Sequence, residues 1–189
     1  MERHVFWHAW TGIGLESCRI RHDTEGVWAE SVALGVEDGE AWALRYTLRG
    51  DVGWRTRELA VVSLGDDATS LRLIGDGAGH WTGADSERLP QLDGCVDVDL
   101  TSTVFTNTLP IRRLGLAPGR SEEIAVVYVT VPGLGVSVSR QRYRSLAATA
   151  EGGRYRFEAP ASGFVAEISV DGDGLVVDYP GIARRVWAR

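Results

Sequence analysis

Two acids and two arginines are the residues whose types and spacing point most directly to chemistry. Asp97 and Asp99 stand two positions apart, and Arg112 and Arg113 are adjacent. A D-x-D pair could bind a divalent cation, whereas an unpaired guanidinium grips phosphate or carboxylate through two hydrogen bonds. Buried charges are costly unless they are paired, and here acids and arginines match in number. We therefore favour ion pairs between one acid and one arginine, which would orient the segment that carries the arginines.

Four further side chains are candidates for binding a ligand. The amide of Asn107 could bond to sugar hydroxyls, or it could satisfy strand edges. Trp54 and Trp81 adjoin turns and polar residues, so they could stack on a sugar ring or line a lipid slot. Trp42, by contrast, lies on an apolar strand face and is expected in the core. Tyr143 stands between two arginines on an expected strand and could face the same site or the surface.

Positive signs of an enzyme are missing from the sequence. The chain contains no Gly-x-Ser-x-Gly and no P-loop, and its four histidines have no metal-ligand spacing. All 20 basic residues are arginine, so lysine chemistry is excluded. We assign no catalytic residue, cofactor or metal. A hydrolase using Asp97 and Asp99 remains an alternative, for which one acid should have a strongly raised pKa inside a cleft.

One helix is expected, over about residues 103–114. Thr103 is a plausible N-cap, Gly115 a natural stop, and Pro110 lies inside and would kink the helix. The alternative starts the helix at Thr108 and places Pro110 in the first turn. Because this segment is apolar nearly all round, it should be buried on several sides.

Most of the remaining chain alternates with the period of two that marks half-buried strands. Glycine-rich and acidic turns separate the runs, and no linker or repeat interrupts them, so residues 1–189 should form a single domain. We expect a mainly β fold in which many antiparallel strands wrap around the one central helix. The expected strands are 5–11, 15–22, 27–36, 41–49, 54–64, 71–74, 80–82, 96–100, 124–131, 136–146, 154–158, 164–170 and 175–179.

Composition limits the partners and the compartment. The 189 residues carry a formal charge of −6, which argues against nucleic acid and anionic membrane surfaces. Cys18 and Cys95 are too few for a disulfide framework and are expected as buried free thiols. The N-terminus has no signal-peptide pattern, and no stretch reaches the roughly 20 apolar residues of a membrane helix. These features predict a cytoplasmic protein.

Several strings resemble the bacterial family of putative glycolipid-binding proteins. They are LDGCVDVDL (92–100), FTNTLPIRRL (105–114), QRY (141–143) and VDGDGLVVDYPG (170–181), joined by WRTR (54–57) and GHW (79–81). One departure is Val104, where the family pattern has proline before the phenylalanine. The resemblance implies a spiral β-roll around a single helix, a homodimer and a glycolipid ligand.

Together these observations predict a protein that binds a small amphipathic molecule, such as a glycolipid or an acyl-bearing metabolite. Strands would supply an apolar lining, and arginines and tryptophans at the rim would hold a polar head. The alternatives are the carboxylate-dependent hydrolase and a structural dimer with a filled core.

Overall fold

The chain folds into one large β-sheet with a short helical segment. The structure is a computed structural model that describes residues 1–65 and 69–189. Its sheet has 14 strands in the order β7-β6-β5-β4-β3-β2-β1-β14-β13-β12-β11-β10-β9-β8. The strands are β1 (Glu2–Ala9), β2 (Gly14–Asp23), β3 (Gly26–Glu37), β4 (Glu40–Gly50), β5 (Thr56–Ser63), β6 (Ser70–Gly75), β7 (Trp81–Thr82), β8 (Asp97–Leu100), β9 (Ser121–Val129), β10 (Val136–Thr149), β11 (Gly152–Ala159), β12 (Phe164–Asp171), β13 (Val176–Tyr179) and β14 (Ala183–Ala188).

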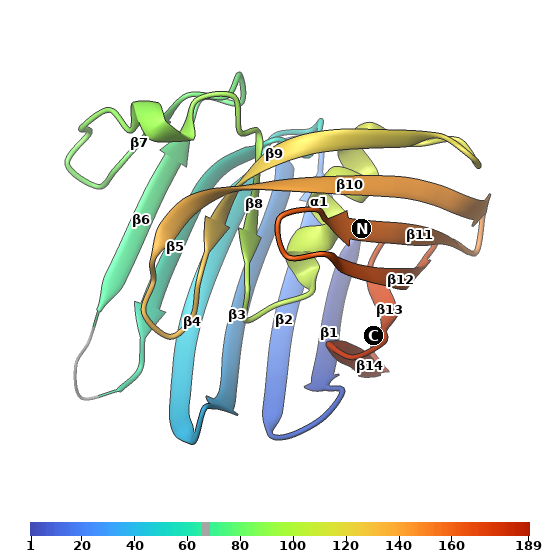
Figure 1. Cartoon of the computed structure of the whole chain (residues 1–189), viewed down its shortest axis with the longest axis horizontal. Helices are drawn as coiled ribbons and strands as arrows, with labels where there is room; N and C mark the ends of the chain where they lie inside the picture. The colour runs from blue at the N-terminus through green and yellow to red at the C-terminus, as the bar shows by residue number, and fades with distance from the viewer. Residues whose placement is uncertain (66–68) are drawn as a thin grey trace.

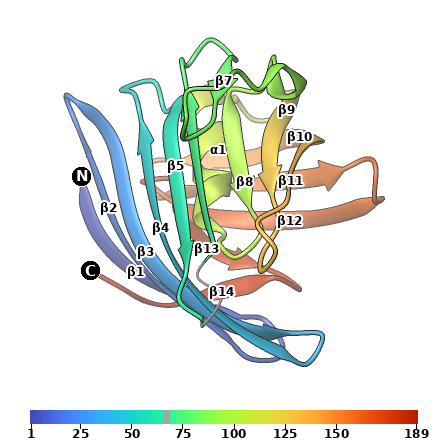
Figure 2. The ribbon, with the colours of Figure 1, turned by 90° about the vertical axis from the view of Figure 1, so that its left-hand side faces the viewer.

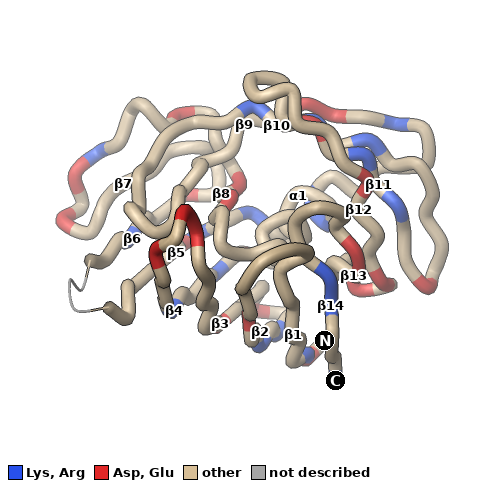
Figure 3. Tube along the Cα trace, turned by 60° about the horizontal axis from the view of Figure 1, so that its bottom comes forward, with Lys and Arg blue, Asp and Glu red and all other residues tan. Residues whose placement is uncertain are grey.

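Two meanders make up this sheet, and they join where the chain ends meet. β1 to β7 run outward in one direction and β14 back to β8 in the other, with β1 and β14 paired at the centre. The sheet curls so that its two halves face each other across α1 (Figures 1 and 2). Figure 3 shows the same curl from the end at which β1–β4 turn.

The sheet does not close, although its last strand approaches the first half. β7 and β8 remain as edges, yet the Thr56 N–H donates to the Val96 carbonyl at 3.3 Å beside β5 and β8. The expected antiparallel pairing holds except at β8–β9, which is parallel. The helical segment lies between these two strands and carries the chain back before β9 begins, so both strands run in the same direction.

The helix lies where it was expected, but it begins with a different geometry. Phe105–Asn107 is a 3₁₀ turn, and the α-helix α1 follows at Thr108–Leu114, as in the alternative start. The Thr103 hydroxyl accepts the Phe105 N–H at 3.0 Å. Gly115 ends α1 with a left-handed φ of 53°, which glycine adopts without strain. None of the described helices is long and apolar enough to cross a bilayer.

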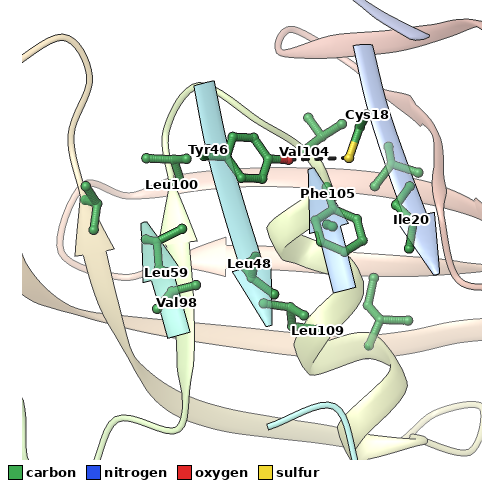
Figure 4. Packing of buried hydrophobic residues seen from close by; sticks show 14 of the residues in the cluster. Cys18, Ile20, Tyr46, Leu48, Leu59, Val98, Leu100, Val104, Phe105 and Leu109 are labelled. Carbon is green, nitrogen blue, oxygen red and sulfur yellow. Dashed lines mark hydrogen bonds between the residues drawn. The ribbon is translucent and has the colours of Figure 1, made fainter. Parts of the chain in front are cut away.

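The buried helical segment lies within the hydrophobic core of the molecule. Phe105 and Leu109 have 0% exposure, and Figure 4 shows them beside Ile20 of β2 and Leu48 of β4. Fully burying one such side chain is worth about 1.5–3 kcal/mol. Residues 103–111 are all buried, so the segment turns no side to solvent before Arg112.

Arg113 ties the end of α1 to β8. Its Nε lies 3.0 and 3.1 Å from the two carboxylate oxygens of Asp97, and its Nη2 lies 2.5 Å from Oδ2. The Asp97 side chain is fully buried, and that of Arg113 is 19% exposed. This pair confirms the expected match of acid and arginine. Arg112 makes no ion pair among the described residues and instead lies over the Trp54 ring, 5.3 Å from its centroid.

Replacing Arg113 by methionine should destabilise the protein by about 3 kcal/mol, because a buried carboxylate loses its partner. Asp97→Asn combined with Arg113→Met should recover much of that loss, since neither position then holds a buried charge. Urea unfolding monitored by tryptophan fluorescence measures both. Arg112→Met is the matched control and should cost under about 1 kcal/mol. Equal losses for Arg112→Met and Arg113→Met would contradict the assigned role.

Candidate functional site

A pocket opens at the end of the sheet where β1–β4 turn, and we call it the end pocket. It has a volume of about 270 Å³ and is open to solvent. The segment 101–104, which leads into the helix, forms one of its walls. Its lining comprises Trp7, His8, Ala9, Thr11, Ile13, Gly14, Leu15, Glu16, Leu34, Val36, Glu37, Trp42, Thr101, Ser102, Thr103, Val104, Ile182 and Ala183.

The end pocket has a buried floor and an exposed mouth, and each contains both polar and apolar side chains. Glu16 and Thr103 are only 4% and 7% exposed, so they lie deep, whereas Ile13 and Ile182 are 65% and 42% exposed. Trp42, which also lines the pocket, is half-buried. Its ring covers Gly35 so closely that a Cβ there would meet the ring at 2.8 Å, which explains the glycine. The pocket therefore offers buried polar atoms at its floor and exposed apolar side chains at its mouth.

Hydroxyl groups hold the carboxyl of Glu16 from the core side. Oε1 accepts hydrogen bonds from the Ser31 hydroxyl at 2.8 Å and the Tyr46 hydroxyl at 2.7 Å. The Tyr46 oxygen also lies 3.2 Å from Oγ1 of Thr103. Tyr46 has a single proton, which the shorter bond uses, so Thr103 donates in the second contact. A continuous chain of hydrogen bonds thus runs from the start of the helical segment to Glu16.

Burial dominates the electrostatics of this cluster. It raises the pKa of Glu16 to about 7, against the lowering effect of the Tyr46, Thr103 and Ser31 hydroxyls. Burial and the nearby Glu16 charge also hold the pKa of the Cys18 thiol well above its usual range, so the thiol stays protonated. Tyr46 likewise stays protonated, because burial raises its pKa well above the ordinary value. The carboxyl of Glu16 is the group of this cluster that changes charge near neutral pH.

Three of the predicted site residues meet in a different place, between β8, β10 and the helical segment. Asp99 accepts a hydrogen bond from the Gln141 amide at 2.5 Å and one from the Thr106 hydroxyl at 3.2 Å. The Tyr143 hydroxyl donates to Oδ1 of Asn107 at 3.0 Å. Tyr143 is 2% exposed, so the alternative of a surface tyrosine is wrong. These polar groups satisfy one another, which indicates a role in positioning the helix.

Burial also raises the pKa of both acids on β8, although the Arg113 guanidinium opposes this at Asp97 and the Gln141 amide does so at Asp99. A hydrolase would need two titratable groups converging on a cleft. Here Asp97 is bound to Arg113 and Asp99 to Gln141, and neither acid lines the end pocket. Among the described residues, no group of three His, Cys, Asp or Glu side chains could hold a metal ion.

The remaining predicted residues lie at other places in the fold. Arg112 and Trp54 contact each other at the far end of α1, where Trp54 also stacks against His22 with ring centroids 4.8 Å apart. Trp81 is buried, and its indole N–H donates to the Cys95 carbonyl at 2.8 Å. Turn-adjacent Trp54 and Trp81 thus belong to the core, while Trp42, expected in the core, is the half-buried tryptophan of the end pocket.

Sequence reasoning missed Glu16, although a signal was present. Glu16 alternates with Cys18 and Ile20, so it occupies a position that faces the interior of an expected strand. A glutamate is almost never fully buried unless it is paired. An inward glutamate among apolar neighbours therefore marks a buried polar site, but only the fold reveals that Ser31 and Tyr46 converge on it.

Glu16→Gln should remove a pH-dependent loss of stability. Because the pKa rises from an ordinary 4.5 to about 7 in the folded state, the folded protein retains a proton that the unfolded chain releases. The resulting stability is complete below pH 4.5 and is lost as pH rises through 7, by at most about 3 kcal/mol.

Urea unfolding of both proteins between pH 5 and 8 measures this effect. The wild type should lose stability relative to Glu16→Gln as pH rises. Contributions from Asp97 and Asp99 are common to both proteins and cancel in the difference. A difference that does not change with pH would contradict the assignment.

Comparisons with known proteins agree with the resemblance seen in the sequence. The family model described as "Putative glycolipid-binding" matches residues 4–185. The crystal structure of a DUF1089 family protein from Pseudomonas aeruginosa has a TM-score of 0.78 and 38% identity, and the match covers 90% of this chain and 92% of that chain. A beta-barrel-like DUF1849 protein from Brucella abortus has a TM-score of 0.57 at 8% identity, covering 99% and 96%, and shares the fold alone. No curated protein matches. Since the family model spans nearly the whole chain, this protein belongs to the Putative glycolipid-binding family.

Proposed function

We propose that the protein binds a small amphipathic molecule of the glycolipid kind in the end pocket. The observation that carries this proposal is that one pocket combines buried polar side chains at its floor, Glu16 and Thr103, with exposed apolar side chains at its mouth, Ile13 and Ile182. Ligand sites typically combine an apolar lining with a few fixed polar groups. Membership of the family supports the same class of ligand.

The size of the pocket limits how much of such a ligand it encloses. Its volume of about 270 Å³ lies just below the roughly 300–1,000 Å³ of typical small-molecule sites. One head group or one short chain fits, and a complete lipid does not. The rest of the molecule would lie outside, along the mouth.

The space between helix and sheet is a less suitable place for a ligand. Phe105 and Leu109 fill it together with side chains from β2 and β4, and all of them are fully buried (Figure 4). Opening a ligand cavity there would separate the helix from the sheet and expose the core. The spiral winding of the strands and the homodimer that the family implies stay predictions.

Native mass spectrometry of freshly purified protein, followed by organic extraction, should detect a bound amphipathic molecule. Protein stripped of that molecule should also bind octyl β-glucoside below its critical micelle concentration, as measured by titration calorimetry. No bound mass in the first measurement and no heat in the second would together contradict the proposal.

Trp42→Ala should weaken octyl glucoside binding about tenfold, because it removes the half-buried ring of the pocket. Trp28→Ala is the matched control: this residue is also half-buried, but it lines a separate groove on the outer face of β3. Its affinity should equal that of the wild type. Loss of binding in Trp28→Ala with full binding in Trp42→Ala would move the site to that outer groove.

A further inference from the structure

The charges around the end pocket are unlike those expected from the sequence. Arginine is absent from its lining among the described residues, which instead includes the acids Glu16 and Glu37 together with His8. The turn between β3 and β4 adds Asp38 and Glu40 beside Glu37, and Figure 3 shows this turn as an acidic stretch. A phosphate or carboxylate head group would meet the like charges of Glu16 and Glu37 here, and no arginine of the described chain lines the pocket to bind it.

The carboxyl of Glu16 is positioned to receive a hydrogen bond from a ligand. Ser31 and Tyr46 both donate to Oε1, which fixes the plane of the carboxyl group. Oε2 is not sealed from solvent, unlike the buried polar atoms that lack a partner, and Glu16 lines the pocket. Oε2 is therefore the atom available at the floor. A hydroxyl group is the matching donor, and hydrogen bonds to an ionised acceptor are about twice as strong as neutral ones.

The Ser102 hydroxyl, beside the pocket, has no hydrogen-bond partner among the described residues. Oγ of Ser102 is sealed and unpaired within the part of the chain that the structure describes, and Ser102 lines the pocket next to Thr103. An unsatisfied buried hydroxyl costs about 1–3 kcal/mol, but this oxygen is sealed from the pocket and so offers a ligand no direct contact. Oε2 of Glu16 is therefore the acceptor that a ligand can reach, and it suits a head group that carries hydroxyl donors, such as a sugar ring.

The mouth is suited to the opposite end of the ligand. Ile13 and Ile182 line the pocket and are 65% and 42% exposed. A chain lying along them would be removed from water at roughly 0.8 kcal/mol for each buried CH₂.

Resting on the proposed function, we propose that the end pocket binds its ligand head first. An uncharged, hydroxyl-bearing head group donates a hydrogen bond to Oε2 of Glu16, and the apolar tail lies along the exposed mouth beside Ile13 and Ile182. The site thus selects neutral glycolipid head groups over phosphate-bearing or acidic ones. Glu16 is the residue that determines this specificity.

The test compares two probes that differ in one group. Octyl β-glucoside and octyl β-glucuronide share the ring and the tail, but the second carries a carboxylate. Titration calorimetry at pH 8, where the carboxylate form of Glu16 prevails, should give at least about tenfold tighter binding for the glucoside. This comparison uses the wild-type protein alone, so it does not depend on the folding of a variant.

Glu16→Gln should weaken glucoside binding about tenfold, since the charged acceptor is lost while Oε1 can still accept from Ser31 and Tyr46. The matched control is Glu30→Gln, on the outer face of β3, which should bind like the wild type. Arg112→Gln tests the arginine anchor expected from the sequence and should also leave binding unchanged.

The outcomes separate this inference from the proposed function. If glucoside binds equally to the wild type and to Glu16→Gln, the head-first assignment is overturned while the pocket proposal stands. Preference for the glucuronide, or loss of binding in Arg112→Gln, overturns it in the same way. If neither probe binds to the stripped wild type, the proposed function itself fails.

Discussion

The structure depends on enclosing one short buried segment, residues 105–111, inside a single curled sheet. A sheet with one apolar face must cover that face, and here the covering is this segment and β8. Val98 and Leu100 of β8 face the first half of the sheet, beside Leu59 and Tyr46 in Figure 4. Since a seven-residue helix is too short to be stable alone, its helicity comes from this packing.

Enclosure has an electrostatic consequence, because the strand that enters the interior carries two acids. Each acid is matched by a donor from a different direction: Arg113 from α1 binds Asp97, and Gln141 from β10 binds Asp99. The Asp97–Arg113 pair and the hydrogen bond from Thr106 to Asp99 hold the helical segment in place against β8, since buried polar groups tolerate few alternative geometries. Residues that look reactive in the sequence therefore serve mainly to position the helical segment.

The same enclosure leaves a polar cavity where the strands end. Thr103 accepts the first N–H of the helical segment and contacts Tyr46, which donates to Glu16. The start of the segment and the floor of the pocket thus share one hydrogen-bond chain. Any molecule that binds Glu16 would act on the chain that holds the helical segment in place, so binding and stability are coupled at this end of the fold.

The sequence by itself determined the mainly β class, most strand positions, the buried helix with its Gly115 end, and the family, because these follow from local periodicity, turn chemistry and a specific string. It also indicated that an acid and an arginine would pair. It did not indicate which ones: Asp97 pairs with Arg113, and Arg112 lies over Trp54. Only the tertiary structure decided the parallel β8–β9 pair and the exchanged roles of Trp42 and Trp54. Only the fold, likewise, brought Glu16 together with Ser31, Tyr46 and Thr103. These residues come from three strands and a loop, and their convergence depends on how the sheet curls, which no local pattern encodes.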